Sequence, residues 1–570
     1  MSYPPSRTAR PIGLLLVVPA LLALLAGYVV PGARTLWNSF HDVALLGGSD
    51  EFTGLDNYSR IAELGFFGGL GFTLAIAVLP VLAACVLAPA LAWLAHRAGT
   101  PGRLVTRLGL VLPMVIVTPV GLSLAWLAAR GRSAREPLEA QLFVGQVFWL
   151  TLFGLLVGAG VTVFLAVLRR SGTGGRPVRA VVAVGLVAGL TVVAYAVQTW
   201  SYPFALTQGG PREATITPML AVYSAGFRTF DLGAGAAGGT LLALLLGLLG
   251  LAAVAVLVLA RVRADVVGPR TGARPVSPLP LIGALALLAI VLAVAGYALW
   301  PWLFPPDTGA GQIEGVGSAF NTWGPPIIST VDGVVLAAFA GFGIGAMRPF
   351  GDRSELLLFV FAPWLFVGTG PFSMVHFQTL SDLDLLDTAL AVLPPVHLSI
   401  PALVVFTLLF RGLAEARPGS PARTLLPALP MVAVVGGITY VMQTQDAYWQ
   451  VITVLDPERM PLPAAALTVG GERALADVAA LPLPIAAVVL FALVLAALQF
   501  FYLDRLSIRT TPAAEPSLTA APGIGQPSGY PPAGYPPAGY PPAGHPPAAS
   551  YPPVPGYPPP APGSAPPGSR

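Results

Sequence analysis

The chain has 570 residues, of which 55% are apolar and only 10% are charged, and its mean hydropathy is +0.76. This composition excludes an ordinary soluble domain and is typical of a polytopic membrane protein. All basic residues are arginines, and they are scattered along the chain, so the net charge of +4 does not indicate nucleic-acid binding. Because the chain has no lysine, it cannot form a G-x-x-x-x-G-K-[ST] phosphate loop, and any ATP would be bound by a partner. The single cysteine, Cys85, and the isolated histidines predict no disulfide, metal site or cofactor.

Apolar runs that approach the roughly 20 residues needed to cross a bilayer recur about twelve times. Half of them precede a polar, proline-containing linker at 263–280, and half follow it. Their centres lie near Leu21, Val81, Val115, Leu155, Leu190 and Leu246, and then near Leu287, Leu336, Leu365, Val404, Val435 and Leu493. The pattern predicts an all-α protein with two six-helix transmembrane domains, 1–262 and 281–509.

The first apolar run, Pro11 to Val30, is read as a retained helix because no small-residue cleavage site follows it. Arginines are concentrated in the segments that would lie inside if the N-terminus is cytoplasmic. We therefore expect a multi-pass protein of the plasma membrane with both termini in the cytoplasm.

The C-terminal segment 510–570 is rich in proline, glycine, alanine and tyrosine, and it repeats GYPPA from Gly529, Gly534 and Gly539. It has too little apolar surface to offset the conformational entropy lost on folding, so we expect a disordered tail. A docking segment for a cytoplasmic partner is the alternative.

Several polar strings between the apolar runs are specific. Phe52 to Tyr58 reads F-x-G-L-D-N-Y, and the segment from Tyr195 to Gly233 contains T-x-G-G-P and F-R-x-F-D-x-G. In the second domain, Gln443 to Leu462 reads QTQDAYWQVITVLDPERMPL. These strings resemble outer segments of the two permease subunits of sugar importers of the ATP-binding-cassette class. The resemblance extends over roughly Pro11 to Arg509, so the chain is similar to two different permease subunits fused head to tail.

The resemblance implies a substrate pathway near the membrane midplane, lined by polar and aromatic side chains. The matching positions are Tyr195, Gln198, Thr199, Trp149, Gln445, Asp446 and Trp449. Thr151, Phe153 and Gly154 depart from the family string that follows the tryptophan. Hydrogen bonds between helices are the alternative role for these polar side chains.

The resemblance also implies two loops that couple the membrane helices to an ATPase through a short E-A-A helix. The first candidate loop is glycine-rich, which disfavours a helix, and the second keeps only a Glu-Ala remnant. The candidate coupling residues are Arg169, Arg170, Arg176 and Arg179 in the first loop, and Arg411, Glu415, Ala416, Arg417 and Arg423 in the second.

Three functions remain open. The first is the permease component of an importer for a carbohydrate or similar solute, with ATPase subunits, an extracytoplasmic solute-binding protein and membrane lipid as partners, and without enzymatic activity of its own. The second is a degenerate permease that has lost ATPase coupling and acts as a scaffold or sensor. The third is a polytopic glycosyltransferase that uses His41, Asp42, Asp50 and Glu51 in the first outer loop.

Overall fold

The computed structural model describes residues 9–43, 51–131, 134–169, 177–268, 277–305, 317–417, 419–468 and 482–510, which belong to one compact unit. Helices dominate these residues, and the only strands among them are four short ones. The tail expected to be disordered lies outside the described residues, apart from Thr510. Asp50, Arg170 and Arg176 also lie outside them.

Nine helices within the described ranges are long and apolar enough to cross a membrane, which supports an all-α multi-pass protein. They are α1–α2 (Ala9–Leu24 and Val30–Asn38, joined by the π-helix η1, Leu25–Val29), α4–α5 (Phe66–Leu82 and Ala88–Arg97, joined by η2, Ala83–Leu87), α9 (Pro137–Leu168), α10 (Pro177–Val197), α13 (Leu232–Leu259), α14 (Pro278–Leu303), α15–α16 (Ala319–Trp323 and Pro325–Phe342, extended by η4, Gly343–Met347), α20 (Leu425–Thr444) and α24 (Ile485–Phe501).

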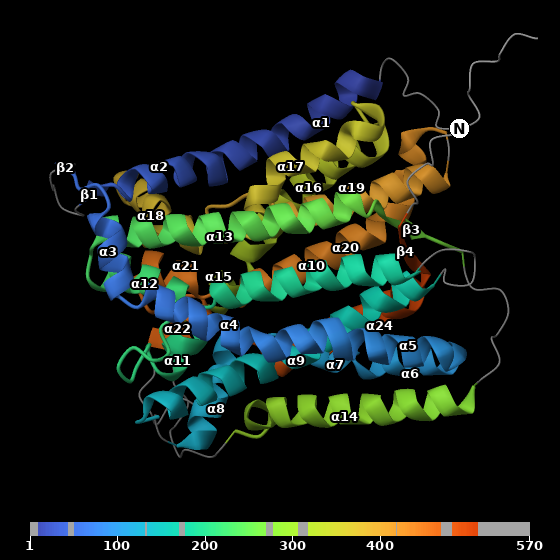
Figure 1. The fold of residues 1–570 in the computed structure, drawn as a ribbon, viewed down its shortest axis with the longest axis horizontal. Helices are drawn as coiled ribbons and strands as arrows, with labels where there is room; N and C mark the ends of the chain where they lie inside the picture. The colour runs from blue at the N-terminus through green and yellow to red at the C-terminus, as the bar shows by residue number, and fades with distance from the viewer. Residues whose placement is uncertain are drawn as a thin grey trace, which may run out of the picture. The chain divides into compact units, whose positions relative to one another are not determined.

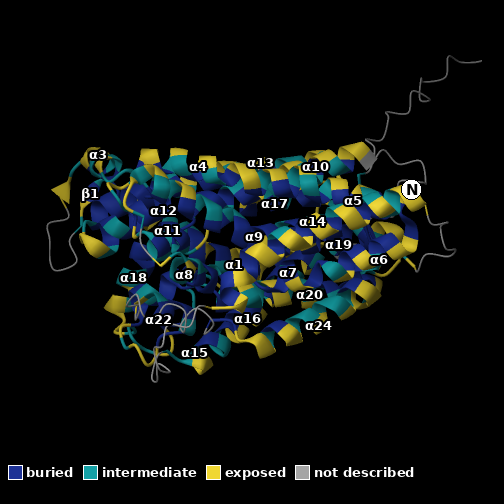
Figure 2. Cartoon of the chain, turned by 90° about the horizontal axis from the view of Figure 1, so that it is seen from below, coloured by how far each residue is buried: buried dark blue, intermediate teal, exposed yellow. Residues whose placement is uncertain are grey.

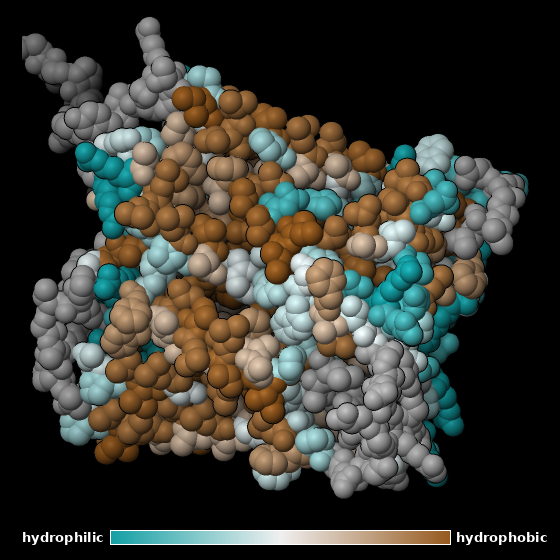
Figure 3. Space-filling view, turned by 180° about the vertical axis from the view of Figure 1, so that it is seen from behind, coloured by the Kyte–Doolittle hydropathy of each residue, from teal (hydrophilic) through white to brown (hydrophobic). Residues whose placement is uncertain are grey.

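Outward-facing apolar side chains cover these helices. Leu429 on α20 and Leu493 on α24 are 58% and 66% exposed. Figure 2 shows exposed residues along the outer surfaces of the long helices, and Figure 3 shows that one face is mainly hydrophobic. Such surfaces are favourable against lipid tails and unfavourable in water.

Three of the twelve runs predicted to span are not straight helices of spanning length. The run near Val115 is bent by 80° between its helices, and with it the number of candidate spans rises to ten. The run near Leu365 is broken, because Pro363, Gly368, Gly370 and Pro371 remove backbone donors and favour turns. The run near Val404 forms α19 (Ile400–Ala416), whose 17 residues are just below the length of a candidate span.

The two broken runs consist of short elements. The first comprises α6 (Gly99–Gly109), α7 (Val111–Val115) and α8 (Pro119–Arg130). The second comprises η5 (Gly351–Leu357), α17 (Leu358–Phe361), η6 (Ala362–Trp364), η7 (Gly370–Phe372) and α18 (Ser373–Asp382).

We call the described residues up to 268 the N-half and those from 277 the C-half. The first helix of each half packs against the other half. Helix α1 contacts α16 and η4, and a Cβ added at Gly13 would lie 3.1 Å from the Cβ of Met347. Helix α14 contacts α5, α6, α8 and α9, and Trp126 on α8 donates a 3.0 Å hydrogen bond to the carbonyl of Ala298 on α14. The halves therefore interlock.

The last residues of the two halves pair with each other. Strand β3 (Val262–Val266) follows α13, strand β4 (Leu506–Thr510) follows α24, and the two are antiparallel, with Ala264 opposite Ile508. The first residues of the predicted linker 263–280 are thus part of a strand. We call this end of the helices the sheet end (Figure 1). The turn η9 (Leu503–Arg505) precedes β4, and η8 (Pro421–Thr424) precedes α20.

Short helices gather at the opposite end, which we call the loop end (Figure 1). They are α3 (Asp56–Glu63), α11 (Ser201–Leu206), α12 (Pro218–Tyr223) with η3 (Ser224–Arg228), α21 (Tyr448–Thr453) and α22 (Leu462–Thr468). A two-residue ladder, β1 (His41–Asp42) with β2 (Glu51–Phe52), also lies there.

Candidate functional site between the two halves

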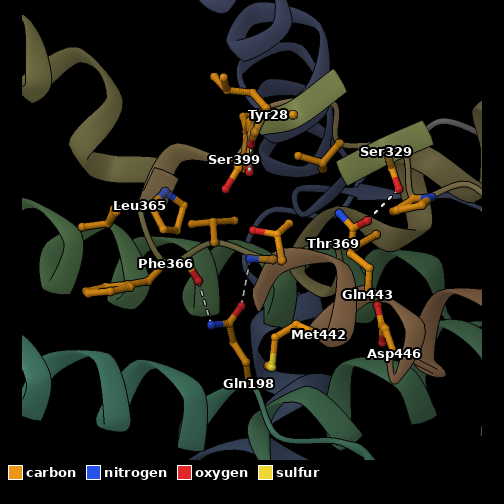
Figure 4. Close-up of a pocket in the computed structure, with 18 of the residues that line it drawn as sticks. Tyr28, Gln198, Ser329, Leu365, Phe366, Thr369, Ser399, Met442, Gln443 and Asp446 are labelled. Atoms are coloured by element: carbon orange, nitrogen blue, oxygen red, sulfur yellow. Dashed lines mark hydrogen bonds between the residues drawn. The ribbon is translucent and has the colours of Figure 1, made fainter. Parts of the chain in front are cut away.

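Two adjoining cavities, of about 380 and 490 Å³, lie where the halves meet. Gln198 of the N-half and Gln443 and Asp446 of the C-half line both of them. Figure 4 shows these side chains around the smaller cavity, together with Tyr28 from the first helix. Residues that the sequence separates by more than two hundred positions thus share one space.

Gln198 and Gln443 belong to two copies of the same sequence string, Tyr-x-x-Gln-Thr. It occurs at Tyr195–Thr199, where α10 ends, and at Tyr440–Thr444, where α20 ends. Gln198 and Gln443 are as far apart in the sequence, to within one residue, as Val262 and Leu506, the first residues of β3 and β4. The two halves therefore repeat the same arrangement at the same spacing. Gln443 was not among the predicted pathway residues, although this internal repeat could have identified it.

The irregular segments of both broken runs reach the cavities. Val117 and Pro119, at the bend between α7 and α8, line the larger cavity. Gly368 and Thr369, between η6 and η7, line both. Non-helical backbone at membrane depth is tolerated only where protein buries it or where it borders a cavity, and here it does both.

Gln198 fixes the break in the C-half. Its Nε2 donates to the carbonyl of Phe366 at 2.7 Å, and its Oε1 accepts from the backbone N–H of Gly368 at 2.9 Å (Figure 4). Gln443 Oε1 accepts from the hydroxyls of Ser329 at 2.7 Å and Thr330 at 3.1 Å. Each glutamine therefore holds an element of the C-half at the edge of the cavities.

Asp446 follows α20 and supplies the carboxylate of the site. Its Oδ1 accepts from the backbone N–H of Tyr448 at 3.1 Å, at the start of α21. Protein surrounds the carboxyl, which keeps some exposure because it faces the cavities. Burial raises the pKa of Asp446 above its ordinary value, and the N–H groups of Tyr448 and Ala447 oppose that shift.

The other predicted pathway residues divide into two groups. Tyr195, Thr199 and Gln445 line the larger cavity, beside Gln198 and Asp446. The two tryptophans line neither cavity.

Trp449 is fully buried and donates from Nε1 to the carbonyl of Leu393 at 3.0 Å, which is a structural contact. Trp149 packs edge-on against Phe153 within the N-half. Neither tryptophan lines the described cavities, because an ungapped match to a family string carries no information on which face of a helix a side chain occupies.

An aromatic cluster borders the larger cavity. Trp200 of the N-half contacts Tyr448 of the C-half edge-on, with ring centroids 5.3 Å apart, and it contacts Tyr223 at the same distance. The Tyr448 hydroxyl bonds with that of Ser373 at 2.7 Å. Trp200 and Tyr448 carry no distinguishing signal in the sequence, because aromatic side chains at the ends of membrane helices are common.

Most described residues of the predicted coupling loops bind other residues of the same chain at the sheet end. Arg411 pairs with Glu355 at 3.1 Å and with Glu415 at 2.9 Å, and Glu415 also binds Arg263 and Arg509, one from each strand. This ionic cluster, in which Arg263, Glu355 and Arg411 are buried, joins α19 to the sheet.

Of the remaining described residues of these loops, two arginines bind backbone carbonyls and three residues are exposed. Arg169 binds Asp504 at 3.6 Å and the carbonyl of Gly268 at 2.8 Å, and Arg417 donates to the carbonyl of Val266. Arg179, Ala416 and Arg423 are exposed. The second loop contains only the four-residue turn η8, so the described part of the loops has no amphipathic coupling helix.

The strings behind the family resemblance have structural contacts at the loop end. Asn57 of F-x-G-L-D-N-Y is fully buried and donates to the carbonyls of Ser39 and His41. Gly233 of F-R-x-F-D-x-G packs against it, since a Cβ there would lie 2.6 Å from the Asn57 side chain. Arg60 pairs with Asp231 at 3.0 Å. These residues fix α3 against α13.

The described residues proposed for a glycosyltransferase take part in local structure. His41 donates from Nδ1 to the carbonyl of Trp37 at 2.8 Å, and its ring stacks on the Trp37 indole. Asp42 pairs with Glu51 in the two-residue ladder, and neither lines a described cavity.

A scan against protein-family models finds no match to this chain, and a search of curated proteins finds no significantly similar sequence.

Proposed function

We propose that the chain is a fused double permease, in which two halves of six membrane passes each form a translocation pathway for a carbohydrate or similar polar solute. The observation that carries the proposal is the site itself: both broken runs and both Tyr-x-x-Gln-Thr strings border the larger cavity between the halves. Discontinuous helices around a polar site at a repeat interface are typical of transporters. In this proposal the bent and broken runs and α19 also cross the membrane, which gives twelve passes.

The interlocked halves support a pathway at their interface. A solute bound there contacts both halves, so a small relative movement would change its exposure from one face to the other. The chain lacks a lysine-containing phosphate loop, so ATPase subunits would drive the movement from the sheet end, which the proposal places in the cytoplasm. An extracytoplasmic binding protein would deliver solute at the loop end.

One observation favours the alternative of a degenerate permease that serves as a scaffold or sensor. Arg169, Arg411, Glu415 and Arg417 make contacts within the chain at the sheet end, and η8 replaces a coupling helix. In this second candidate function the sheet and its ionic cluster hold the halves together permanently.

Purification of the tagged full chain from its native membrane in a mild detergent separates the two. The permease proposal expects an ATP-binding-cassette ATPase to co-purify and to hydrolyse ATP. Reversing the charge of Arg179 and Arg423, exposed at the sheet end, should remove the ATPase. The matched reversals of Arg34 and Arg212, exposed near the loop end, should retain it. If the intact, folded chain carries no ATPase, the scaffold or sensor function takes its place.

A further inference from the structure

Asp446 differs from other enclosed carboxylates of the chain in its surroundings. Glu355 pairs with two arginines, and Asp504 with three. Among the described residues, no arginine or histidine lies within ion-pair distance of Asp446, whose described partners are backbone N–H groups. An enclosed carboxylate without a counter-charge is costly, so a carboxylate at this position indicates a cation that the chain does not supply.

The described residues that line the two cavities also favour a cation beside Asp446. The described lining contains no arginine or histidine, and Asp446 is its only carboxylic acid. The cavity lining therefore carries negative charge alone whenever Asp446 is ionised. A cationic ligand is favoured there, and an anionic one is disfavoured.

The remaining lining groups define the rest of the ligand. Aromatic rings of Tyr195, Trp200 and Tyr448 border the larger cavity, and such faces attract both ammonium groups and the apolar faces of sugars. Amide and hydroxyl side chains, including Gln198, Thr369 and Ser399, border both cavities. They suit a ligand with several hydroxyl groups.

We propose that the cavities bind a polyhydroxylated solute that carries a protonated amine, an amino sugar in chemical class, with the amine on the Asp446 carboxylate. This inference rests on the proposed function in that it names the solute of the proposed pathway. Binding itself requires neither an ATPase nor transport.

Asp446 also has a structural role that the test must separate from ligand binding, because its Oδ1 accepts the N–H of Tyr448 at the start of α21. Asp446→Asn keeps an oxygen in that position and removes the charge. Asp382→Asn, at an exposed position at the end of α18, is the matched control.

The experiment measures equilibrium binding of radiolabelled glucosamine and glucose to the full chain in lipid nanodiscs free of sugar detergents. A charge-assisted hydrogen bond is roughly twice as strong as a neutral one, so glucosamine should bind at least about tenfold more tightly than glucose. Asp446→Asn should abolish this preference while retaining glucose binding, and Asp382→Asn should preserve it. N-acetylglucosamine, which keeps the nitrogen but not the charge, should behave like glucose.

Equal binding of the two sugars, no binding of glucosamine to folded protein, or an unchanged preference in Asp446→Asn would each overturn the inference. Failure of the proposed function is distinguishable, because it appears as the absence of an ATPase in the purified complex. A chain that prefers glucosamine and recruits no ATPase retains the ligand assignment and loses the transport role.

Discussion

Arg263 and Arg509 lie opposite each other in the β3–β4 register, and Glu415 binds both. Two like charges opposite each other in a sheet repel, and the Glu415 carboxylate offsets this repulsion together with Glu355, which pairs with Arg263, and Asp265, which pairs with Arg509. Because the strands end the two halves, this single side chain joins the N-half, the C-half and α19.

Replacing Glu415 with glutamine should therefore destabilise the sheet end. The change removes a charged acceptor from three arginines, and we expect a loss of about 1–3 kcal/mol, measured as a lower apparent unfolding temperature in detergent. Glu458→Gln, at an exposed position of the loop end, is the control and should leave the unfolding temperature unchanged. Equal stability of the two variants would show that the cluster does not hold the sheet.

The strand pairing can be tested with a disulfide. Ala264 and Ile508 are register partners, so cysteines at both positions, in a Cys85→Ala background, should cross-link on oxidation. After cleavage at a protease site engineered within 269–276, the two fragments should migrate together until a reductant is added. The single-cysteine variants should separate. Fragments that separate in the oxidised double variant would contradict the pairing of the chain segments 262–266 and 506–510.

The packing of the broken run near Leu365 against α13 makes a prediction for Gly250. A Cβ there would collide with the carbonyl oxygen of Ala362, so Gly250→Ala should cost about 1–3 kcal/mol of stability. Gly437 on α20 has no neighbour within 4 Å of an added Cβ among the described residues, so Gly437→Ala should be neutral or stabilising by up to about 1 kcal/mol. Thermal unfolding of both variants measures the difference, and the opposite order would refute this packing.

The sequence predicts the long spans because sustained apolar runs have few alternatives in lipid. Near Leu365 the surrounding residues are apolar enough to predict a continuous spanning helix. The structure has a broken helix there instead, because Pro363, Gly368 and Gly370 interrupt it. The average hydropathy of a segment gives no information on whether its backbone hydrogen bonds are interrupted. The break nevertheless lies at the candidate site, where irregular backbone is stabilised by Gln198.

Long-range pairing explains the other differences. Arg411 and Glu415 were expected to face a partner, but they bind a sheet formed by segments from the two halves of the chain. No local pattern in 262–266 indicates its partner at 506–510. Gln198 and Asp446, which the resemblance assigns to a substrate pathway, border the same cavities, and polar side chains at the ends of α10 and α20 are costly unless they face a cavity or a partner. Their role in a pathway stays a prediction.

The most direct test of the proposed pathway is cysteine accessibility at Thr369, which lines both cavities. In a Cys85→Ala background, Thr369→Cys would be treated with a membrane-impermeant maleimide in vesicles of both orientations. Ala416→Cys and Glu213→Cys, exposed at the sheet and loop ends, report the two faces. A water-filled pathway predicts that Thr369→Cys is modified in the folded, membrane-embedded protein and that glucosamine slows the reaction. If Thr369→Cys reacts from neither face until the protein is unfolded, the space between the halves is not a solute pathway.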